Sequence, residues 1–585
     1  MIDTSQTLHQ LVLEGVRKNE NFICATREPY GWNKLDSTAF TDFVRKTALA
    51  LHQAGIKKGD KVAIHAHNSS HWIIFDLAVM SIGAISIPIY VTQSPEQIEY
   101  ILDHSETKLI FVSGEQLMER YKDFEHKISH IQKIALAKNP KEGFTPFDEF
   151  LKKSEEAQNP EALFEELKGV AQPDDLACIS YTSGTTGTPK GVMLSHRNLA
   201  HGIQAPMKRC FFFGKKLTKE DAGLSFLPFS HIFEHAVIYA YLKISLPVYI
   251  VSDPEMIKEA LKETAPLHFT TVPRVLEKIY QNIMIKAEAS TGIMGYIFKY
   301  AINLTKTYKI NERPGLLYSL IDKVIFRRIR KELGGRIEGI TAGGAALSAE
   351  IMHFFNAIGI PTAQAYGLTE TAPGLTAYHK HNLVLGSVGS ALEDVEIKIC
   401  DDGEIAAKGP NIMLGYYKDE EKTKDALRDG WFHTGDVGHI DERGFLFITD
   451  RKKELLKLST GKYIAPNPIE NKLATYPFIE QSILVGDRQK FCAVILILTE
   501  SYRAKTGPEK VKKDISRAIK SINKTLSPWE TIKTYRLSEE LFSIENGELT
   551  PTLKKKRSVI YKNRHKDIQA IYDACEENIN TPLTP

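Results

Sequence analysis

The chain has 585 residues, of which 43% are hydrophobic and 25% are charged, a composition typical of globular proteins. It is too long for one hydrophobic core, so several folded units are predicted. The formal net charge is only +3, from 75 basic and 72 acidic residues, so nothing points to a nucleic-acid partner. The six cysteines form no Cys-x-x-Cys pair, which argues against a disulfide or zinc framework and for reduced thiols in the cytoplasm.

Targeting and membrane-spanning segments are not predicted. The first residues contain no basic segment followed by an apolar core, the pattern of a signal peptide. The most apolar stretch, 72–91, is interrupted by Asp76, Gly83 and Pro88, so it fits a buried helix and a strand better than a membrane span. We therefore expect a soluble, cytoplasmic protein.

The first 170 residues alternate between helical and extended patterns. Helices are predicted at 40–55, 72–82 and 96–104, and strands at 61–64, 84–89 and 108–112. This alternation is typical of a parallel sheet with helices on both faces. The same rhythm returns at 221–280, and 281–340 is predicted to form long helices with basic and aromatic positions.

A loop rich in hydroxyls and glycines runs from Tyr181 to Gly191, between an apolar strand at 176–180 and a helix N-cap at Ser195. Glycines let the backbone approach a ligand closely, so that N–H groups and hydroxyls can surround phosphate oxygens, and Lys190 adds a positive charge. The loop is not a Walker A motif, because Pro189 and Gly191 stand where that motif needs Gly and Ser or Thr. The alternative is an ordinary surface loop, which has the same composition.

Two glycine-rich segments follow. Thr341–Ala345 places paired glycines after an apolar run, which lets a flat ligand lie on the backbone. In Ala363–Thr371, Tyr366 offers an aromatic face for a purine, Thr369 a hydroxyl for phosphate, and Glu370 a hard oxygen ligand for Mg²⁺. Taken alone, this tyrosine fits a core aromatic equally well, and this glutamate fits a solvated turn.

Three more segments complete the pattern. Gly430–Gly438 contains Asp436, a carboxylate that can accept hydrogen bonds from both ribose hydroxyls. After a charged run at 450–454 the chain becomes richer in lysine, and we place a domain boundary there. Lys457–Glu470 and Asn546–Arg557 follow; the three lysines of the latter, taken alone, are typical of a solvated face.

In this order, these segments, with the two glycine-rich ones counted together as one of five, resemble the motifs of the adenylate-forming (AMP-binding, acyl-activating) enzymes. The resemblance covers essentially the whole chain. It implies an α/β fold with a large N-terminal region of layered α/β subdomains at 1–450, holding the ATP and acyl sites, and a small mobile C-terminal α+β domain at 451–585. It also implies ATP, Mg²⁺ and coenzyme A as cofactor and co-substrates.

The same resemblance assigns roles residue by residue. The implied catalytic residues are Lys554, Thr182, Glu370 and His231, and the implied magnesium ligands are Glu370 and Thr182. The implied nucleotide- and cofactor-binding residues are Tyr181, Thr182, Ser183, Gly184, Thr185, Thr186, Lys190, Gly343, Gly344, Ala345, Gln364, Ala365, Tyr366, Gly367, Thr369, Asp436, Ile448, Arg451, Lys457 and Gly461.

Some of these roles have alternatives. Lys554 is in register with the family's catalytic lysine, but Leu553 replaces the glycine that precedes it, so Lys555 and Lys556 are further candidates. Thr460 replaces a family glycine in the loop that approaches the thiol acceptor. His231 lies where acyl chain and thiol would meet, or it is a core histidine.

Weaker sequence similarities indicate a particular branch of this family. Leu227–Glu234, Val272–Tyr280, the 281–340 insert and Asn546–Thr552 resemble long-chain fatty acyl-CoA synthetases, although the insert fits a purely structural elaboration as well. The predicted function is therefore a long-chain fatty acid–CoA ligase, an AMP-forming acid–thiol ligase. The alternatives are an adenylation enzyme that serves a carrier protein, a ligase for medium-chain or aryl acids, a luciferase-type oxygenase and a non-catalytic nucleotide-binding protein. The tail after Lys554, about 30 residues, is too short for a carrier domain.

Peripheral association with membranes is expected as well. Met207–Lys216 places three aromatics between basic residues, and 299–331 mixes aromatics with Arg327, Arg328 and Arg330. Basic residues favour an anionic leaflet, and aromatics favour the interface. In the alternative interpretation, the aromatics at 211–213 are buried.

Overall fold

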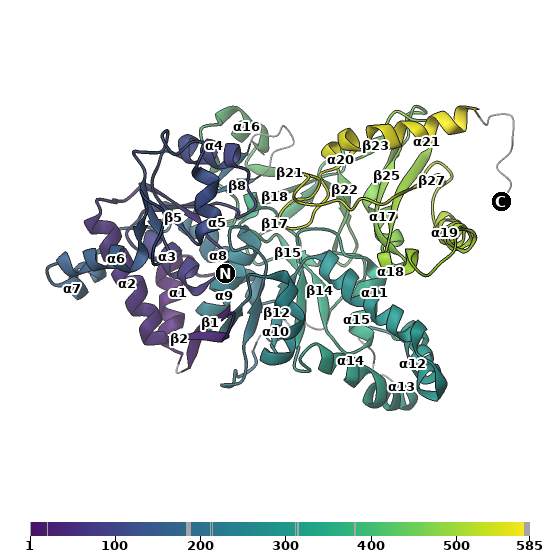
Figure 1. Ribbon diagram of the computed structural model, residues 1–585, viewed down its shortest axis with the longest axis horizontal. Helices are drawn as coiled ribbons and strands as arrows, with labels where there is room; N and C mark the ends of the chain where they lie inside the picture. Colours follow the sequence, from purple (N-terminus) through teal and green to yellow (C-terminus); the bar gives the residue numbers. More distant parts are fainter. Residues whose placement is uncertain are drawn as a thin grey trace.

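The computed structural model describes residues 2–19, 21–182, 189–210, 212, 214–310, 312, 315–379 and 382–577. Three sheets and their helices form the larger part of the molecule, and a smaller unit formed by the C-terminal residues packs against one end (Figure 1). This is the predicted mixed α/β architecture.

An eight-stranded sheet has the order β19-β9-β8-β4-β3-β5-β6-β7. Its strands are parallel except for β9 and β19, which run antiparallel to their neighbours. Its bounds are β3 Lys61–His65, β4 Ile85–Pro88, β5 Thr107–Val112, β6 Gln132–Ala135, β7 Thr145–Pro146, β8 Leu176–Thr182, β9 Lys190–Ser195 and β19 Gly415–Tyr416. The predicted phosphate loop therefore joins two antiparallel strands at the place where the parallel pattern ends.

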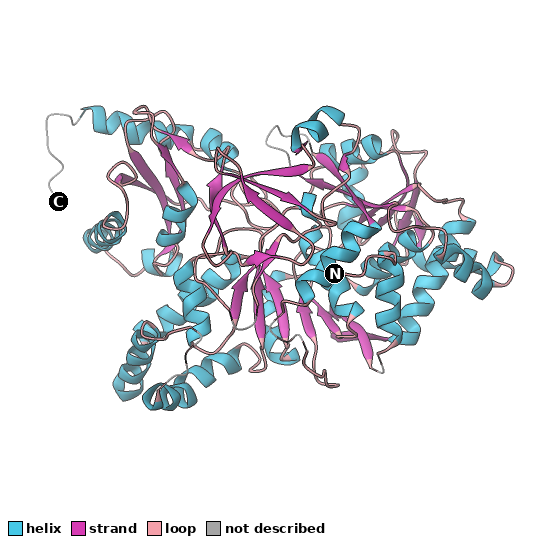
Figure 2. Cartoon of the chain, turned by 180° about the vertical axis from the view of Figure 1, so that it is seen from behind, coloured by secondary structure: helices cyan, strands magenta, loops and turns pink. Residues whose placement is uncertain are grey.

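A seven-stranded sheet has the order β14-β13-β12-β10-β11-β1-β2 and is parallel except for the β1–β2 hairpin. Its bounds are β1 Phe22–Glu28, β2 Gly31–Asp36, β10 Gly223–Ser225, β11 Val248–Ile250, β12 His268–Thr271, β13 Gly339–Ala342 and β14 Thr362–Gln364. Figure 2 shows helices packed around both sheets, as the alternating sequence pattern predicts.

The helices of the larger part follow the predicted ranges closely, for example at α2, α3 and α4. Their bounds are α1 Leu8–Arg17, α2 Ser37–Gln53, α3 Ser70–Ser81, α4 Pro95–Ser105, α5 Glu115–Met118, α6 Phe147–Leu151, α7 Pro160–Lys168, α8 His196–Met207, α9 Ile232–Lys243, α10 Ile257–Thr264, α11 Pro273–Ala289, α12 Gly292–Thr305, α13 Leu316–Ile321, α14 Arg327–Glu332, α15 Ala349–Ala357 and α16 Glu420–Ala426. The predicted N-cap is confirmed, because the Ser195 side chain accepts a hydrogen bond from the Asn198 N–H.

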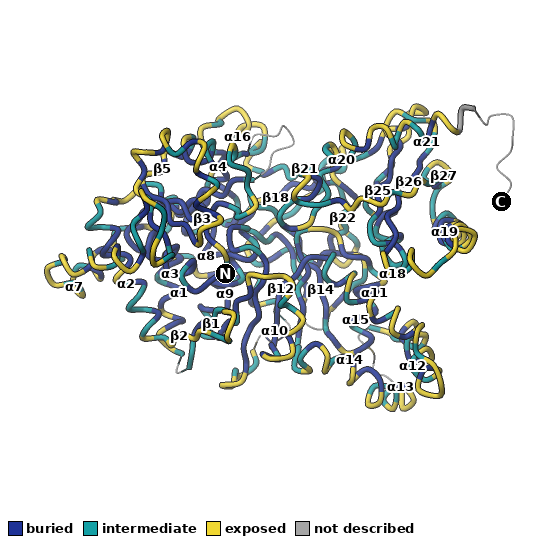
Figure 3. The backbone as a smooth tube through the Cα atoms, in the orientation of Figure 1, coloured by how far each residue is buried: buried dark blue, intermediate teal, exposed yellow. Residues whose placement is uncertain are grey.

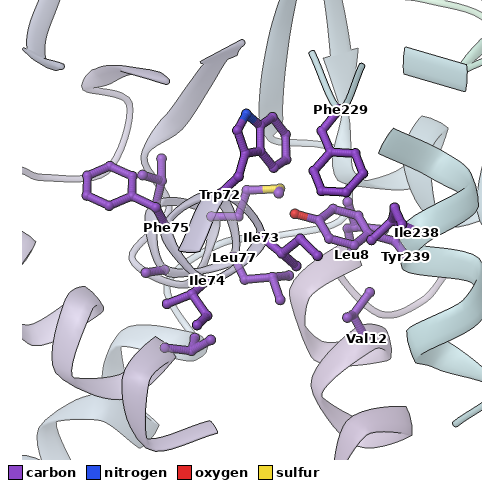
Figure 4. Close-up of a cluster of buried hydrophobic side chains, with 14 of the residues drawn as sticks. Leu8, Val12, Trp72, Ile73, Ile74, Phe75, Leu77, Phe229, Ile238 and Tyr239 are labelled. Atoms are coloured by element: carbon purple, nitrogen blue, oxygen red, sulfur yellow. The ribbon is translucent and has the colours of Figure 1, made fainter. Parts of the chain in front are cut away.

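Helix α3 lies in the middle of the largest hydrophobic core. Eleven of its twelve residues are buried, as expected for a helix that is apolar on every side. Figure 4 shows Trp72 and Phe75 on this helix, with Phe229 and Tyr239 packed beside it. The apolar stretch at 72–91 is thus core, as predicted.

A third sheet closes the larger part. Strands β17, β18, β21 and β20 lie in that order, and β22 pairs with β21. The bounds are β15 Thr376–Ala377, β16 Ser390–Ala391, β17 Glu396–Ile399, β18 Glu404–Lys408, β20 Leu427–Arg428, β21 Trp431–Ile440 and β22 Leu446–Arg451. β22 ends at Arg451, one residue past the predicted boundary at 450.

The C-terminal unit has a three-stranded sheet, β25-β26-β27, and cores of its own. Its bounds are β23 Leu456–Lys457, β24 Tyr463–Ile464, α17 Pro466–Leu473, β25 Ile479–Val485, β26 Cys492–Leu498, α18 Glu500–Arg503, α19 Pro508–Asn523, β27 Ile532–Ser538, α20 Arg557–Asn563 and α21 His565–Glu577. Two hydrophobic clusters consist of residues from this unit alone, and the clusters of the larger part end at Ile448. Among the described residues, no hydrophobic cluster crosses 450.

Polar contacts join the two parts. Arg274 at the start of α11 forms an ion pair with Glu480, and the Gln281 side-chain amide donates to the carbonyls of Ala474 (3.3 Å) and Ile479 (3.1 Å). At the boundary, both the backbone N–H and the side-chain amide of Asn467 donate to the carboxylate of buried Asp450. Burial raises the pKa of this carboxyl to about 6.

Candidate active site

A cavity of about 1460 Å³ lies between the larger part and the C-terminal unit. It exceeds the roughly 300–1,000 Å³ of common small-molecule sites, so it has room for more than one substrate. Many residues predicted for the site line it: Tyr181, Thr182, Lys190, His231, Gly343, Gly344, Gln364, Ala365, Tyr366, Gly367, Thr369, Glu370, Arg451 and Lys554. The fold thus brings together segments that are nearly 400 residues apart in sequence.

The phosphate-loop prediction falls partly outside the described residues, which omit Ser183, Gly184, Thr185 and Thr186. The two ends of the loop are described. Thr182 and Lys190 face each other at the end of the β8–β9 ladder. The Tyr181 ring is buried, and its hydroxyl lies 2.8 Å from His104 Nδ1. This tyrosine therefore belongs mainly to the core behind the loop.

Lys190 and Glu370 are linked by a tyrosine that was not predicted. The Tyr416 hydroxyl donates to Glu370 Oε1 at 2.9 Å, and Lys190 Nζ lies 4.9 Å from the centre of the Tyr416 ring. Burial lowers the pKa of Lys190. Sequence spacing alone gives no sign that distinguishes Tyr416 from a core aromatic.

The paired glycines have separate structural roles. A Cβ at Gly343 would lie 2.8 Å from the Phe233 ring, so only glycine allows this packing. Gly344 has φ +84°, and a Cβ there would lie 3.7 Å from Lys554 Cε. The loop is held from below by Gln364, whose side chain accepts from the Leu347 N–H (3.0 Å) and donates to the Ala345 carbonyl (3.2 Å). Ala345 itself is exposed and does not line the cavity.

Asp436 is tied to two other predicted residues. Its Oδ2 accepts from the Tyr366 hydroxyl at 2.7 Å, and its Oδ1 accepts from Arg451 Nε at 3.0 Å. Asp436 is buried and, unlike these two partners, does not line the cavity. A carboxylate has about four lone-pair sites, so both oxygens can still accept from a ligand that reaches them. Ile448, also predicted, packs behind Tyr366 outside the cavity.

The three lysines of the C-terminal motif have different surroundings. Lys554 Cε lies close to the Gly344 backbone inside the cavity. The pKa of Lys554 is lowered to about 8, mainly by burial and also by the nearby Arg451 charge, while the charges of Asp436, Glu454 and Glu370 oppose this. Lys555 instead forms a 2.5 Å ion pair with buried Glu470, which also binds Arg557 at 2.9 Å. This geometry favours Lys554 among the three.

Leu553 has the left-handed backbone that its family counterpart, a glycine, adopts without strain. Its φ is +59°, a region that costs most L-residues roughly 1–2 kcal/mol. The Lys554 N–H is held by the Thr550 hydroxyl at 3.0 Å, and the Thr550 N–H donates to the Lys554 carbonyl at 2.8 Å.

His231 begins α9 and lies at the edge of the cavity. Its Nδ1 accepts from the Phe233 N–H at 3.2 Å, so it caps the helix. Burial lowers the pKa of His231 to about 3, with a smaller effect from the Lys554 charge. The imidazole is therefore neutral at physiological pH, and both earlier interpretations, a site histidine and a core histidine, describe part of its environment.

An apolar wall, formed by α8 and α9, extends the cavity away from the charged end. Successive turns of α9 contribute Ile232, Ala236 and Ala240, and α8 contributes Ile203 and Met207. From Ile232 to Ala240 the wall follows α9 for about 12 Å, at 1.5 Å per residue. Behind it, buried Glu234 accepts hydrogen bonds from Ser225 and Thr270, and burial raises the pKa of Glu234 to about 7.

The turn predicted to approach the thiol acceptor lies elsewhere. Lys457 and Gly461 are exposed at the β23–β24 hairpin and do not line the cavity. The Lys457 N–H donates to Asp487 at 3.1 Å. In this arrangement the C-terminal unit presents Lys554, and not the 457–461 turn, to the cavity.

Comparison with known proteins decides the family. The profile described as "AMP-binding enzyme" matches residues 14–417, and that of the "AMP-binding enzyme C-terminal domain" matches residues 453–576. The chain belongs to the AMP-binding enzyme family. It is 31% identical to the long-chain-fatty-acid–CoA ligase FadD15 of Mycobacterium bovis over 96% of each chain. It is 32% identical to the peroxisomal long chain acyl-CoA synthetase 6 of Arabidopsis thaliana over 88% of this chain and 78% of the other.

Solved structures share the fold. The A domain of a carboxylic acid reductase from Segniliparus rugosus, in complex with AMP and a carboxylic acid, superposes with a TM-score of 0.76 at 21% identity, over 97% of this chain and 94% of the other. The predicted fold is thereby confirmed. Family membership and these relatives also confirm the predicted enzyme class, an AMP-forming acid–thiol ligase.

The residues present fit magnesium. Glu370 and Thr182 line the same cavity and offer oxygen ligands, which Mg²⁺ prefers. Within the described ranges, no group of three or more His, Cys, Asp or Glu side chains could hold a metal ion.

Proposed function

We propose that this enzyme is a long-chain fatty acid–CoA ligase, which forms an acyl-adenylate from ATP and then a thioester with coenzyme A. The observation that supports it best is the continuity of one cavity. Its charged end contains Lys554, Arg451 and Glu370, and its other end is the apolar wall of α8 and α9. A nucleotide fits the first end, and an alkyl chain fits the second. The identity with curated long-chain ligases over almost the full chain supports the same substrate class.

In the first half-reaction, a carboxylate oxygen attacks the α-phosphorus of ATP, the bond to pyrophosphate breaks, and pyrophosphate leaves. Both reactants are anions, so the enzyme must supply positive charge and correct placement. Lys554 is the half-buried cation beside Gly344, and Lys190 with the Thr182 hydroxyl provides donors at the phosphate loop. Magnesium, held by Glu370 and Thr182, would add positive charge on the phosphates.

Tyr366 and Asp436 would position the nucleoside. The Tyr366 ring lines the cavity and offers a face for adenine. Asp436 lies directly behind it and would accept from the ribose hydroxyls, with Arg451 holding the carboxylate in place. The hydrogen bonds among these three residues exist before any ligand binds, so little reorganisation is needed.

In the second half-reaction, the thiol of coenzyme A attacks the acyl carbonyl carbon, the bond to AMP breaks, and the thiol proton passes to solvent. We propose that the C-terminal unit, taken as residues 451–585, first rotates about Asp450. The rotation would withdraw Lys554 and bring the exposed 457–461 turn to the cavity. Only polar contacts would be exchanged, because no described hydrophobic cluster spans the boundary.

The test is AMP formation measured with and without coenzyme A, across saturated acids of increasing length and an aryl acid such as benzoate. We expect turnover that requires coenzyme A and rises toward long chains. Strong AMP release without coenzyme A would favour an enzyme that serves another acceptor. A preference for benzoate or medium-length acids would contradict the long-chain proposal while leaving the ligase class intact.

A further inference from the structure

Exposed hydrophobic side chains are concentrated in one corner of the molecule. Among the residues that the structure describes, nine of the seventeen exposed large hydrophobic residues lie between 285 and 324. Scattered exposed hydrophobics are normal, but a cluster marks an interaction surface. Figures 1 and 3 show helices α12 and α13 at this corner, largely exposed and away from the cavity-forming elements α8 and α9.

One face of the α13–α14 helix is apolar at its start and basic at its end. Leu316, Leu317 and Leu320 are 89%, 52% and 61% exposed. Further along, past a π-helical turn at Asp322–Phe326, Lys323, Arg327 and Arg328 are exposed as well. The opposite face contains Tyr318, Phe326 and Ile329, which are buried in the core. The exposed leucines are therefore not needed to hold the helix on the protein.

Helix α12 packs beside this helix and adds a similar surface. Ile293 and Tyr296 are 81% and 77% exposed, and Tyr300 lies one turn further along the helix, next to exposed Lys299. The inner side of α12 is anchored by Ala301, which is completely buried.

The basic residues of this surface are available to an external partner. Lys299, Lys323, Arg327 and Arg328 form no ion pair with any described residue, whereas neighbouring Arg330 is paired with Asp322 at 2.5 Å. Between 281 and 336 the sequence has eleven basic and four acidic residues. The surface therefore combines exposed leucines and tyrosines with unneutralised positive charge.

We propose that the exposed face of α12, α13 and α14 docks on the surface of an anionic lipid bilayer. Leucines and tyrosines would enter the boundary between headgroups and acyl chains, and the basic end of the helix would lie among the lipid phosphates. A protein groove would satisfy the leucines but would need a matching acidic rim, whereas an anionic leaflet supplies negative charge everywhere. Docking is peripheral, because no described helix combines the length and hydropathy of a membrane span. The proposal stands whether or not the acyl substrate is long.

The other segment predicted to meet membranes does not fit. Phe211 and Phe213 lie outside the described residues. Phe212 is buried, with its ring centre 5.3 Å from that of His268. Lys215 is paired with Glu338 at 2.5 Å. The expectation of an exposed aromatic is therefore wrong for Phe212, which packs into the core, whereas the basic residues Lys208 and Lys216 are exposed as expected.

The experiment is co-sedimentation of the full chain with phosphatidylcholine vesicles, with and without phosphatidylglycerol, at low and high salt. We expect binding to anionic vesicles that weakens with salt, since the charge attraction is screened. Arg327→Ala with Arg328→Ala should weaken binding about 30-fold, at roughly 1 kcal/mol for each charge. Leu316→Ser with Leu320→Ser should reduce it at both salt concentrations.

Matched controls remove similar groups elsewhere. Lys510→Ala with Lys512→Ala takes two exposed charges from α19, and Leu537→Ser with Leu541→Ser takes two exposed leucines from the C-terminal unit. Both controls should bind vesicles like the wild type, and thermal unfolding should show that all variants fold.

Three outcomes would overturn the proposal. The first is that the wild type does not bind anionic vesicles at low salt. The second is that the folded arginine and leucine variants of α13 and α14 bind as well as the wild type. The third is that the wild type forms a dimer in analytical ultracentrifugation and these variants do not. The last would identify a second copy of the chain as the occupant of the surface.

Discussion

Lys554 is the residue on which the proposed adenylation chemistry depends most. Its replacement by alanine should lower the rate of acyl-adenylate formation by about 10²–10³-fold, the range seen when one charge-stabilising group is lost. Thioester formation from supplied acyl-AMP should be largely retained, because phosphoryl charge does not develop in that step. The measurement is pyrophosphate release beside thioester formation.

Lys555→Ala is the informative comparison for this prediction. Lys555 neutralises buried Glu470, so we expect a lower unfolding temperature with adenylation retained in the folded protein. If Lys555→Ala abolished adenylation while Lys554→Ala did not, Lys555 and not Lys554 would be the catalytic lysine.

The pH dependence of adenylation follows from the same lysine. Its pKa is lowered to about 8 in the ligand-free protein, so Lys554 loses its positive charge as pH rises through about 8. We expect kcat/KM for ATP to fall above that pH, since this parameter reports groups of the free enzyme. Lys554→Arg should move the fall to higher pH, because a guanidinium stays protonated. A profile that is flat up to pH 10 would contradict the prediction.

The backbone of Leu553 offers a test of strain beside the active site. Leu553→Gly should raise the free energy of unfolding by about 0.5–1 kcal/mol, since relief of the left-handed conformation exceeds the entropy cost of glycine. Leu541→Gly is a matched control, because Leu541 is an exposed leucine without positive φ, and it should destabilise. Chemical denaturation of both variants measures the difference.

At the scale of elements, α9 should limit the length of the acyl chain. His231 at its start lies near Lys554, and Ala240 lies about 13 Å further along the apolar wall. Ala240→Phe should therefore reduce kcat/KM for long acids by at least tenfold and leave short acids nearly unaffected. Ala240→Val should shorten the preferred acid less. Equal losses for all lengths would mean that the wall does not hold the acyl chain.

Local patterns in the sequence predicted the elements well and the walls of the cavity poorly. The Ser195 cap and the strand before the phosphate loop follow from residues close in sequence, and both are confirmed. Helix α9 is apolar on nearly every side, so its sequence cannot show which side faces a cavity. Tyr416 and Phe212 likewise depend on contacts with distant residues. Most site residues were predicted from the resemblance to the family motifs, because local sequence patterns alone could not identify them.

At the scale of the whole molecule, the cavity lies between the two parts. It is therefore closed only while the C-terminal unit is in contact with the larger part. Lys554 comes from the C-terminal unit, while Gly344, Tyr366 and Glu370 come from the larger part. The contacts that hold the parts together include Arg274 with Glu480 and Asn467 with Asp450. Polar contacts of this kind can be exchanged with water at small cost, as a rotating domain requires.

The separation of the hydrophobic cores makes the two parts separate cooperative units of folding. Calorimetry of the ligand-free enzyme should show two heat-absorption peaks, because unfolding of the C-terminal unit leaves the other cores intact. A ligand that contacts both parts, such as an acyl-adenylate analogue, should raise the lower transition toward the upper one. A single two-state peak without ligand would contradict this view. If the two parts unfold separately, mutations that destabilise only the C-terminal unit should abolish adenylation at temperatures at which the larger part is still folded.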